Sequence, residues 1–429
     1  MQPVDLLLVN PPRPYLVAPH AQAPLGLLYL GAAAEAEGLS VRIHNMAGAG
    51  ANQYDWDIPP AGVYGLTGSF LDVTMVNVLA GEIKRRYPDA GVVVGGPISL
   101  SAGELEKDFI RTVVHGEAEL AVADIMSGET PWDFLAPVPD DLDSLPFPAR
   151  RLWPGPLGGN VFLGGANYFG GGSATIITTR GCPFSCAFCA GPALASRKVR
   201  KRSPSSVVAE MEVCARDFGI RQFRFSDEFL TAAGPHVDGI CEGILRSKVL
   251  KHGDGVAWRA SIGVNPHEVS MFKLMKAAGC REVSLGIESA DPEVLALISK
   301  KGTPADGLAA LESARAAGVK TRALLMVGTP GETPATLRHN LVFIRTAPFD
   351  GLAVTMFTPI PGCEIARDPR KFKCWLRPEQ AHSLCVYGPG GRMKVVPAIT
   401  VEGLTSDEFA EQINIVLDAA EATGKLGRG

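Results

Sequence analysis

The amino-acid sequence predicts an α/β protein in which an N-terminal, Rossmann-like doubly wound domain is followed by a partial (β/α)6 barrel and a short C-terminal helical segment. Short apolar runs alternate with helical stretches in two series, and a segment rich in proline and glycine separates the series. With 429 residues the chain is long enough for two or three domains. We therefore expect domains at 1–130 and 173–365, a linker at 131–172 and a C-terminal extension at 366–429.

The first series begins with a continuous apolar run at residues 4–10, which ends at Pro11 and Pro12 and indicates a buried parallel strand. Four more strands are expected before residue 130, separated by helical stretches such as 73–86, and these strands lie at 41–44, 63–67, 91–94 and 112–115. In a doubly wound sheet, ligands bind outside the carboxyl ends of the strands. The small residues in the loops that follow these strands therefore mark the expected ligand site.

The second series begins with a strand at 174–178, which leads directly into a group of three cysteines. Five further strands are expected, at 222–226, 256–262, 282–285, 322–327 and 352–357. In barrels of this kind the chemistry gathers at the C-terminal ends of the strands. After the barrel, the helical pattern at 406–423 predicts a final helix.

Composition excludes several classes of protein. Charged residues make up 20% of the chain and the formal net charge is −4, so there is no overall basic field for nucleic acid. No run of 18 apolar residues predicts a membrane span, and the N-terminus does not have the pattern of a signal peptide. Nine cysteines, none of them before Cys182, favour a reducing compartment over a disulfide framework. We expect a cytoplasmic protein.

The cysteines after the first barrel strand form the pattern CxxxCxxC at Cys182, Cys186 and Cys189. Three thiolates at this spacing suit a four-iron cluster, in which one iron keeps an open position for a small molecule. A structural zinc site is the alternative, but zinc normally takes four protein ligands and no nearby cysteine or histidine completes a second pair. The motif therefore predicts a [4Fe–4S] cluster.

This motif resembles that of the radical S-adenosylmethionine superfamily, and later segments extend the resemblance. Leu285-Gly286-Ile287-Glu288-Ser289 is similar to a fourth-strand motif of the family, and 326–333 is similar to its fifth-strand segment. The resemblance implies S-adenosylmethionine bound at the cluster, a 5′-deoxyadenosyl radical, and a low-potential electron donor such as flavodoxin or ferredoxin. It also implies cofactor contacts at Phe188, Asp227, Arg259, Ser261, Glu288 and Gly328.

The N-terminal domain, followed by a Pro-rich segment before the barrel, resembles the cobalamin-binding branch of that superfamily over residues 4–365. The resemblance implies cobalamin contacts at Leu25, Gly26, Thr67, Ser69, Gly95, Gly96, Pro97, Gly116 and Glu117. The DxHxxG motif that supplies a lower axial histidine in many cobalamin proteins is absent, so we predict no such ligand. The alternative is that the N-terminal domain has this fold but binds no cobalamin and has only a structural role. Methylthiotransferases share the layout but need three N-terminal cysteines, which this chain lacks.

The resemblance implies a methyltransferase that acts on an unactivated carbon of a small metabolite; a short peptide is also compatible. Alternatives with the same cofactors are a cyclase, a rearrangement enzyme or an oxidase. A radical epimerase is a further alternative, because Cys363 follows the sixth barrel strand and could return a hydrogen atom to a substrate radical. An ordinary buried cysteine is the competing interpretation of Cys363. The last alternative function is that of a non-catalytic protein that carries or senses an iron–sulfur cluster or cobalamin.

Overall fold

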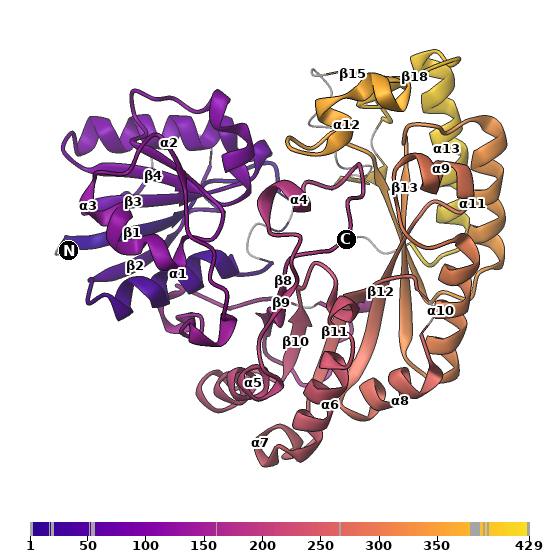
Figure 1. The fold of residues 1–429 in the computed structure, drawn as a ribbon, viewed down its shortest axis with the longest axis horizontal. Helices are drawn as coiled ribbons and strands as arrows, with labels where there is room; N and C mark the ends of the chain where they lie inside the picture. Colours follow the sequence, from indigo (N-terminus) through magenta and orange to yellow (C-terminus); the bar gives the residue numbers. More distant parts are fainter. Residues whose placement is uncertain are drawn as a thin grey trace. The chain divides into compact units, whose positions relative to one another are not determined.

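A computed structural model describes residues 3–16, 18, 21–50, 52, 56–159, 161–265, 267–377, 387–388, 391–392 and 394–426. The chain divides into two compact units, Met1–Gly159 and Asn160–Gly429, and each contains one six-stranded parallel sheet (Figure 1). The predicted α/β class is confirmed. No helix in the described parts of the chain is long and apolar enough to cross a membrane.

The sheet of the first unit has the strand order β2-β1-β3-β4-β5-β6. Its strands are β1 (Val4–Asn10), β2 (Val41–Asn45), β3 (Ala61–Thr67), β4 (Gly91–Gly95), β5 (Thr112–His115) and β6 (Asp133–Leu135). The chain order reverses between β1 and β3, and this switch point is where doubly wound sheets leave a crevice for a ligand. Strand β6 lies in the stretch that the sequence suggested was a linker, and it pairs with β5.

Both faces of this sheet are covered, which explains why β1 is apolar throughout. Leu8 packs beneath α1 (Leu25–Ala36), whose Gly31 approaches its side chain. Leu7 and Val9 point to the opposite face and join the core cluster that includes Val76 and Leu79 of α2 (Val73–Arg86). Successive residues of a strand point to opposite faces, so a strand covered on both sides shows no polar alternation.

The sheet of the second unit has the order β14-β13-β12-β11-β10-β7 and does not close on itself. Its strands are β7 (Ser173–Ile176), β10 (Gln222–Phe225), β11 (Ala257–Ile262), β12 (Cys280–Glu288), β13 (Lys320–Val327) and β14 (Gly351–Met356). Its helices include α5 (Pro204–Phe218), α6 (His236–Arg246), α8 (Val269–Ala277), α9 (Pro292–Leu297), α10 (Pro304–Ala316) and α11 (Pro334–Thr346). This arrangement is the predicted partial barrel.

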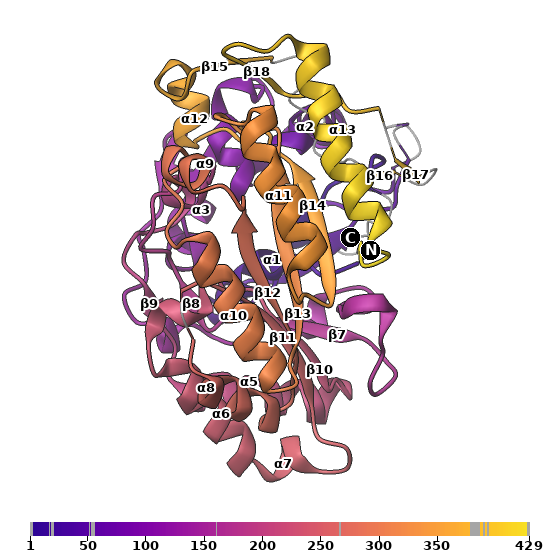
Figure 2. The ribbon, with the colours of Figure 1, turned by 90° about the vertical axis from the view of Figure 1, so that its right-hand side faces the viewer.

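The two faces of the barrel sheet differ in chemistry. On β12, Val283, Leu285 and Ile287 are buried on the face that the helices cover, and Ile287 lies against Gly307 of α10. Figure 2 shows α10 and α11 lying along this outer side. The alternating residues of β12, among them Glu282 and Glu288, belong to the inner face. The barrel therefore has an apolar outside and a polar inside.

After the barrel, the chain forms α12 (Glu364–Arg367), a short antiparallel pair of β15 (Cys374–Leu376) with β18 (Ile399–Val401), and α13 (Ser406–Ala422). Phe409, Ile413 and Leu417 bury one face of α13, which lies beside α11 (Figure 2). The predicted final helix is present. Its first residue follows a capping box made by Thr405 and Glu408.

Trp258 is the largest fully buried side chain of the second unit. Its ring stacks on Phe225 with centroids 4.9 Å apart, and its Nε1 donates to the carbonyl of Ala278 at 2.9 Å. We expect Trp258→Ala to lower the free energy of unfolding by about 3–5 kcal/mol. Urea denaturation followed by circular dichroism measures this. The half-exposed Trp375 is the matched control, and Trp375→Ala should change the value by less than about 0.5 kcal/mol.

Candidate functional site

The three motif cysteines lie on one loop between β8 (Thr179–Arg180) and α4 (Gly191–Leu194). Cys182 and Cys186 are half-buried and Cys189 is exposed. Within the loop, the N–H of Cys189 donates to the carbonyl of Cys186 at 3.1 Å, and the N–H of Gly191 donates to the sulfur of Cys189 at 3.2 Å. The loop is reached from the carboxyl end of β7, as the barrel fold predicts.

Two distant segments hold the middle of this loop through Ala187. The Ala187 N–H donates to the carbonyl of Ile298 at 2.8 Å, and its own carbonyl accepts from the N–H of Ile365 at 3.0 Å. Ala187 is fully buried, so both of its backbone groups need partners inside the protein. The residues after α9 and the start of α12 thus fix the loop that carries the cysteines.

Asp227, two residues after the end of β10, anchors the turn before the cysteine loop. Its Oδ1 accepts from the N–H and hydroxyl of Thr178, both at 2.9 Å, and from the N–H and hydroxyl of Thr179. Its Oδ2 is buried without a hydrogen-bond partner, and burial raises the pKa of Asp227 to about 6. Asp227 therefore fixes the backbone of Thr178 and Thr179, which precede the cysteine loop.

Glu288 ends β12 in a left-handed conformation, with φ of 60°. The ladder to β13 shifts register here, between Gly286 and Glu288. The Glu288 carboxylate folds back over Gly286, where an added Cβ would come within 2.6 Å of Oε1, and Lys300 donates to that oxygen at 3.2 Å. Lys300 follows Ile298 by two residues, and the Ile298 carbonyl accepts from Ala187 of the cysteine loop, so this ion pair lies near the loop.

The other residues predicted to contact S-adenosylmethionine lie in the cysteine loop, within β11 and just after β13. Phe188 is half-buried within the cysteine loop, and Ser261 lies on the inner face of β11. Arg259 is used inside the barrel: it donates to the carbonyl of Val161 at 2.5 Å and to the hydroxyl of Ser284 at 3.0 Å. A cofactor contact by Arg259 would have to share these bonds. Gly328 follows β13 with φ of 77°.

Glu332 supports the Gly328 turn and was not singled out by the sequence. Its Oε2 accepts from the N–H groups of Gly328 at 2.6 Å and Thr329 at 3.2 Å, while Oε1 is buried without a hydrogen-bond partner. Burial raises the pKa of Glu332 to about 8. The side chain is therefore largely neutral near pH 7.

Cys363 is fully buried and begins α12, where its sulfur accepts from the N–H of Ala366 at 3.3 Å. Burial raises the pKa of this thiol. The geometry of Cys363 is that of a helix cap on the segment that holds Ala187.

The cysteine loop fits a cluster better than a single ion. Among the residues that the structure describes, no three His, Cys, Asp or Glu side chains are gathered closely enough to hold one metal ion. A four-iron cluster places each thiolate on a different iron, so its ligands stand farther apart. Burial raises the pKa of Cys186 and Cys189, and Lys300 opposes this shift at both thiols.

In the first unit, the predicted ligand residues lie at the carboxyl ends of the strands. Thr67 ends β3, and Gly96, with φ of 83°, turns so close to it that a Cβ would lie 2.8 Å from the Thr67 hydroxyl. The N–H of Ile98 donates to the carbonyl of Gly68 at 2.8 Å, which joins the two loops. The remaining residues predicted to contact cobalamin lie at the start of α1, in the turn after β3, at the end of β4 and in the loops after β4 and β5: Leu25, Gly26, Ser69, Gly95, Pro97, Gly116 and Glu117.

Asp72 also lies near the carboxyl ends of these strands, and the sequence did not predict a role for it. Its buried carboxylate accepts from Arg13 Nε at 3.1 Å, the Tyr15 hydroxyl at 2.5 Å and the Ser69 N–H at 2.7 Å. Asp72 therefore joins the loop after β1 to the turn after β3, at the switch point. Arg13 and Asp72 are 59 residues apart, and no sequence motif links them.

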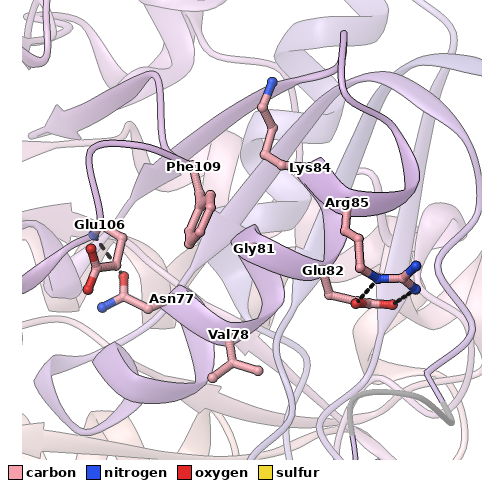
Figure 3. A pocket seen from close by; sticks show the side chains of 8 residues that line it. All are labelled: Asn77, Val78, Gly81, Glu82, Lys84, Arg85, Glu106 and Phe109. Atoms are coloured by element: carbon pink, nitrogen blue, oxygen red, sulfur yellow. Dashed lines mark hydrogen bonds and ion pairs between the residues drawn. The ribbon is translucent and has the colours of Figure 1, made fainter.

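A shallow surface pocket on α2 lies outside this group of residues. Figure 3 shows Asn77, Gly81 and Arg85 along the helix and Phe109 facing it. Arg85 and Glu82 are paired at 2.7 Å, and Glu106 donates its N–H to Asn77. None of the predicted ligand residues lines this pocket.

The raised pKa of Glu332 predicts a pH-dependent stability. The folded-state pKa of about 8 lies above the ordinary 4.5, so the contribution to stability is fully present below about pH 4.5 and is lost as the pH rises through about 8. Glu332→Gln keeps an acceptor for Gly328 but does not titrate. We expect the stability of the wild type relative to this variant to fall by about 1 kcal/mol or more between about pH 5 and pH 9. Urea denaturation across this range measures it, and a constant difference would contradict the prediction.

Comparison with known proteins agrees with this architecture. Residues 176–344 match the family model of the Radical SAM superfamily. An uncharacterized methyltransferase from Pyrococcus horikoshii is 27% identical over 398 residues, which cover 85% of this chain and 83% of the relative.

Two solved structures share the fold of the whole chain. The radical S-adenosylmethionine methyltransferase TsrM from Kitasatospora setae, with cobalamin and a [4Fe–4S] cluster bound, has a TM-score of 0.72 and 19% identity. The match covers 99% of this chain and 91% of TsrM. The cobalamin-dependent S-adenosylmethionine radical enzyme OxsB, with aqua-cobalamin bound, has a TM-score of 0.64 and 16% identity over 98% of this chain and 62% of OxsB. Residues 176–344 therefore match the Radical SAM superfamily, and the chain shares the fold of TsrM and OxsB.

Proposed function

We propose that this protein is a cobalamin-dependent radical S-adenosylmethionine methyltransferase that methylates an unactivated carbon of a small molecule. The observation that carries the proposal is the three-cysteine loop, which is fixed at the carboxyl ends of the barrel strands beside the Glu288–Lys300 pair. The relative from Pyrococcus horikoshii is named a methyltransferase, and TsrM has been solved with its substrate tryptophan. These names support methyl transfer and a small substrate.

Cys182, Cys186 and Cys189 would hold the cluster, and Glu288 and Gly328 would contact S-adenosylmethionine. The Glu288 carboxylate is an acceptor for hydroxyl or ammonium groups, and Lys300 keeps it oriented. Gly328 presents backbone without a side chain, so a flat ring can approach closely. When bound, the cluster supplies the electron that cleaves S-adenosylmethionine, and cobalamin carries the methyl group.

The first unit offers two features that suit a large ligand at its switch point. Asn10, at the end of β1, is buried and has an Oδ1 with no hydrogen-bond partner, although its Nδ2 donates to Asn45 at 2.8 Å. The loops after β3 and β4 meet through glycines, which leave backbone free to contact a ligand. We assign these loops to the cobalamin tail, with no histidine as lower ligand.

Two alternatives to a methyltransferase are considered. The first uses the same cofactors, and the second does not use cobalamin. A cyclase, rearrangement enzyme or oxidase would give a product without the added methylene unit, so the product mass separates it from a methyltransferase. An epimerase would need the Cys363 thiol at the substrate. The thiol is fully buried and bonded to Ala366, which favours a structural role for Cys363.

Replacing any of the three motif cysteines by alanine should abolish cluster binding. Each thiolate binds one iron, so we expect iron to fall from about four per chain to near zero and dithionite-dependent cleavage of S-adenosylmethionine to be lost. Iron analysis and detection of 5′-deoxyadenosine measure both. Cys241→Ala, which changes a cysteine buried in α6, should retain both. Full iron content in the Cys186→Ala variant would contradict the assignment.

Asp72→Ala should weaken cobalamin binding because it releases Arg13, Tyr15 and Ser69 at the switch point. We expect the dissociation constant for hydroxocobalamin to rise at least about tenfold, the equivalent of one lost charged hydrogen bond. Absorbance titration of the cluster-loaded protein measures it. The exposed Asp89→Ala is the control, and iron content checks that the second unit is intact. Unchanged affinity would mean that this edge does not hold the ligand.

A further inference from the structure

The three residues that follow Glu288 form a buried turn between β12 and α9, and we call residues 289–291 the Glu288 turn. The N–H of Ser289 donates to the carbonyl of Ile287 at 2.8 Å. The N–H of Asp291 donates to the Ser289 hydroxyl at 3.1 Å. Because the turn is buried, each of its backbone groups needs a partner inside the protein.

Asn340 of α11 supplies the partner for the middle of the Glu288 turn. Its Oδ1 accepts from the N–H of Ala290 at 2.7 Å. The other buried side chains of α11 that pack on the barrel are apolar, namely Leu337, Phe343 and Ile344. Asparagine is seldom buried, and burying its amide is costly unless the amide is hydrogen-bonded. The contact with the turn therefore accounts for a polar residue on this face of the helix.

The neighbouring residue of α11, His339, contacts the same turn. Its Nδ1 lies 2.6 Å from Oδ2 of Asp291. The other oxygen, Oδ1, accepts from two N–H groups in the first turn of α9, both at 2.9 Å. Lys300 follows the end of α9 by three residues. The Glu288 turn thus fixes the start of the helix that leads to Lys300.

The Glu288 turn lies between the two members of an ion pair. Glu288 comes directly before it, and Lys300 Nζ reaches back to the Glu288 carboxylate at 3.2 Å. The left-handed backbone of Glu288, with φ of 60°, persists only where its surroundings impose it. By holding Ala290, Asn340 fixes the chain immediately after this residue. Asn340 therefore helps to set the direction in which the carboxylate points.

Helix α11 is also bonded to the turn after β13. Glu332 accepts from the N–H groups of Gly328 and Thr329, and Thr333, the next residue, caps α11. The helix is therefore attached at its start to the Gly328 turn and, through Asn340, to the Glu288 turn. One helix thus holds two predicted cofactor contacts from different strands in a fixed relation.

We propose that Asn340 is a positioning residue for S-adenosylmethionine, acting through the Glu288 turn and not by touching the ligand. This inference rests on the proposed function. Without the Asn340 oxygen, the buried Ala290 N–H loses its partner, and the turn must rearrange to recover one. The backbone of Glu288 can then leave its left-handed conformation, which moves the carboxylate away from Lys300 and from the ligand.

Asn340→Leu removes the acceptor and keeps a side chain of similar length. We expect the dissociation constant of the cluster-loaded protein for S-adenosylmethionine to rise at least about tenfold, with unchanged iron content. Isothermal titration calorimetry measures the affinity. Phe343→Leu is the matched control, because it removes packing against Phe349 from the same helix and leaves Asn340 in place. It should leave the affinity unchanged. Asn340→Ala tests the same hydrogen bond if the leucine variant does not fold.

A double-mutant cycle with Glu288→Ala separates positioning from a general loss of stability. If Asn340 acts through Glu288, Asn340→Leu should change the dissociation constant by less than about twofold once the carboxylate is absent. The inference is overturned if the Asn340 variants keep the wild-type affinity. It is also overturned if Asn340→Leu weakens binding by the same factor with and without the Glu288 carboxylate.

Urea denaturation of the same four proteins tests the turn without any ligand. Because both changes act on one turn, their effects on the free energy of unfolding should not add. Wild-type protein that binds and cleaves S-adenosylmethionine, with additive effects of the two changes on both affinity and stability, contradicts the role of Asn340 and leaves the proposed function in place. Non-additive stabilities in a protein that neither binds nor cleaves S-adenosylmethionine contradict the proposed function and leave the link between Asn340 and Glu288 in place.

Discussion

The position of the three cysteines depends on two backbone hydrogen bonds to one buried residue, Ala187. The cysteine loop has no sheet or long helix of its own, so partners distant in the sequence must satisfy its amides. One partner is Ile298, two residues before Lys300, and the other is Ile365 in α12. The same contacts that fix the loop therefore also fix Lys300, and through it the Glu288 carboxylate, relative to the thiols.

Glu288 shows that this arrangement has a conformational cost. A left-handed backbone at a residue other than glycine costs about 1–2 kcal/mol, and Glu288 occupies it at a register shift in the central strand β12. Gly286 provides the space into which the carboxylate turns. Strain of this kind persists where the surroundings impose it, and here the Lys300 ion pair and the bulge do so. The cost makes a role in ligand binding more reasonable than a role in packing.

The sequence predicted the two sheets and the placement of the motifs because both are local signals: apolar runs, glycine turns and cysteine spacing. It did not reveal what holds the site together. Asp227 joins Thr178 across 49 residues and Asp72 joins Arg13 across 59, and such contacts arise only when strands become neighbours. Polar residues at strand ends were consequently predicted as cofactor ligands, while the structure shows Asp227 and Arg259 bonded to other parts of the barrel. Cofactor contact at these positions stays a prediction.

A closed eight-stranded barrel fills its interior with layers of apolar side chains. This six-stranded sheet is open and places arginine, glutamate and serine on its inner face, so its interior is not a second hydrophobic core. The outer face, packed against α8, α10 and α11, therefore provides most of the apolar burial of the unit. Because stability comes from the outside, the inner face is free to carry charges that would be costly in a closed core. The division of one sheet into a stabilising face and a polar face is what allows the barrel to hold ligands.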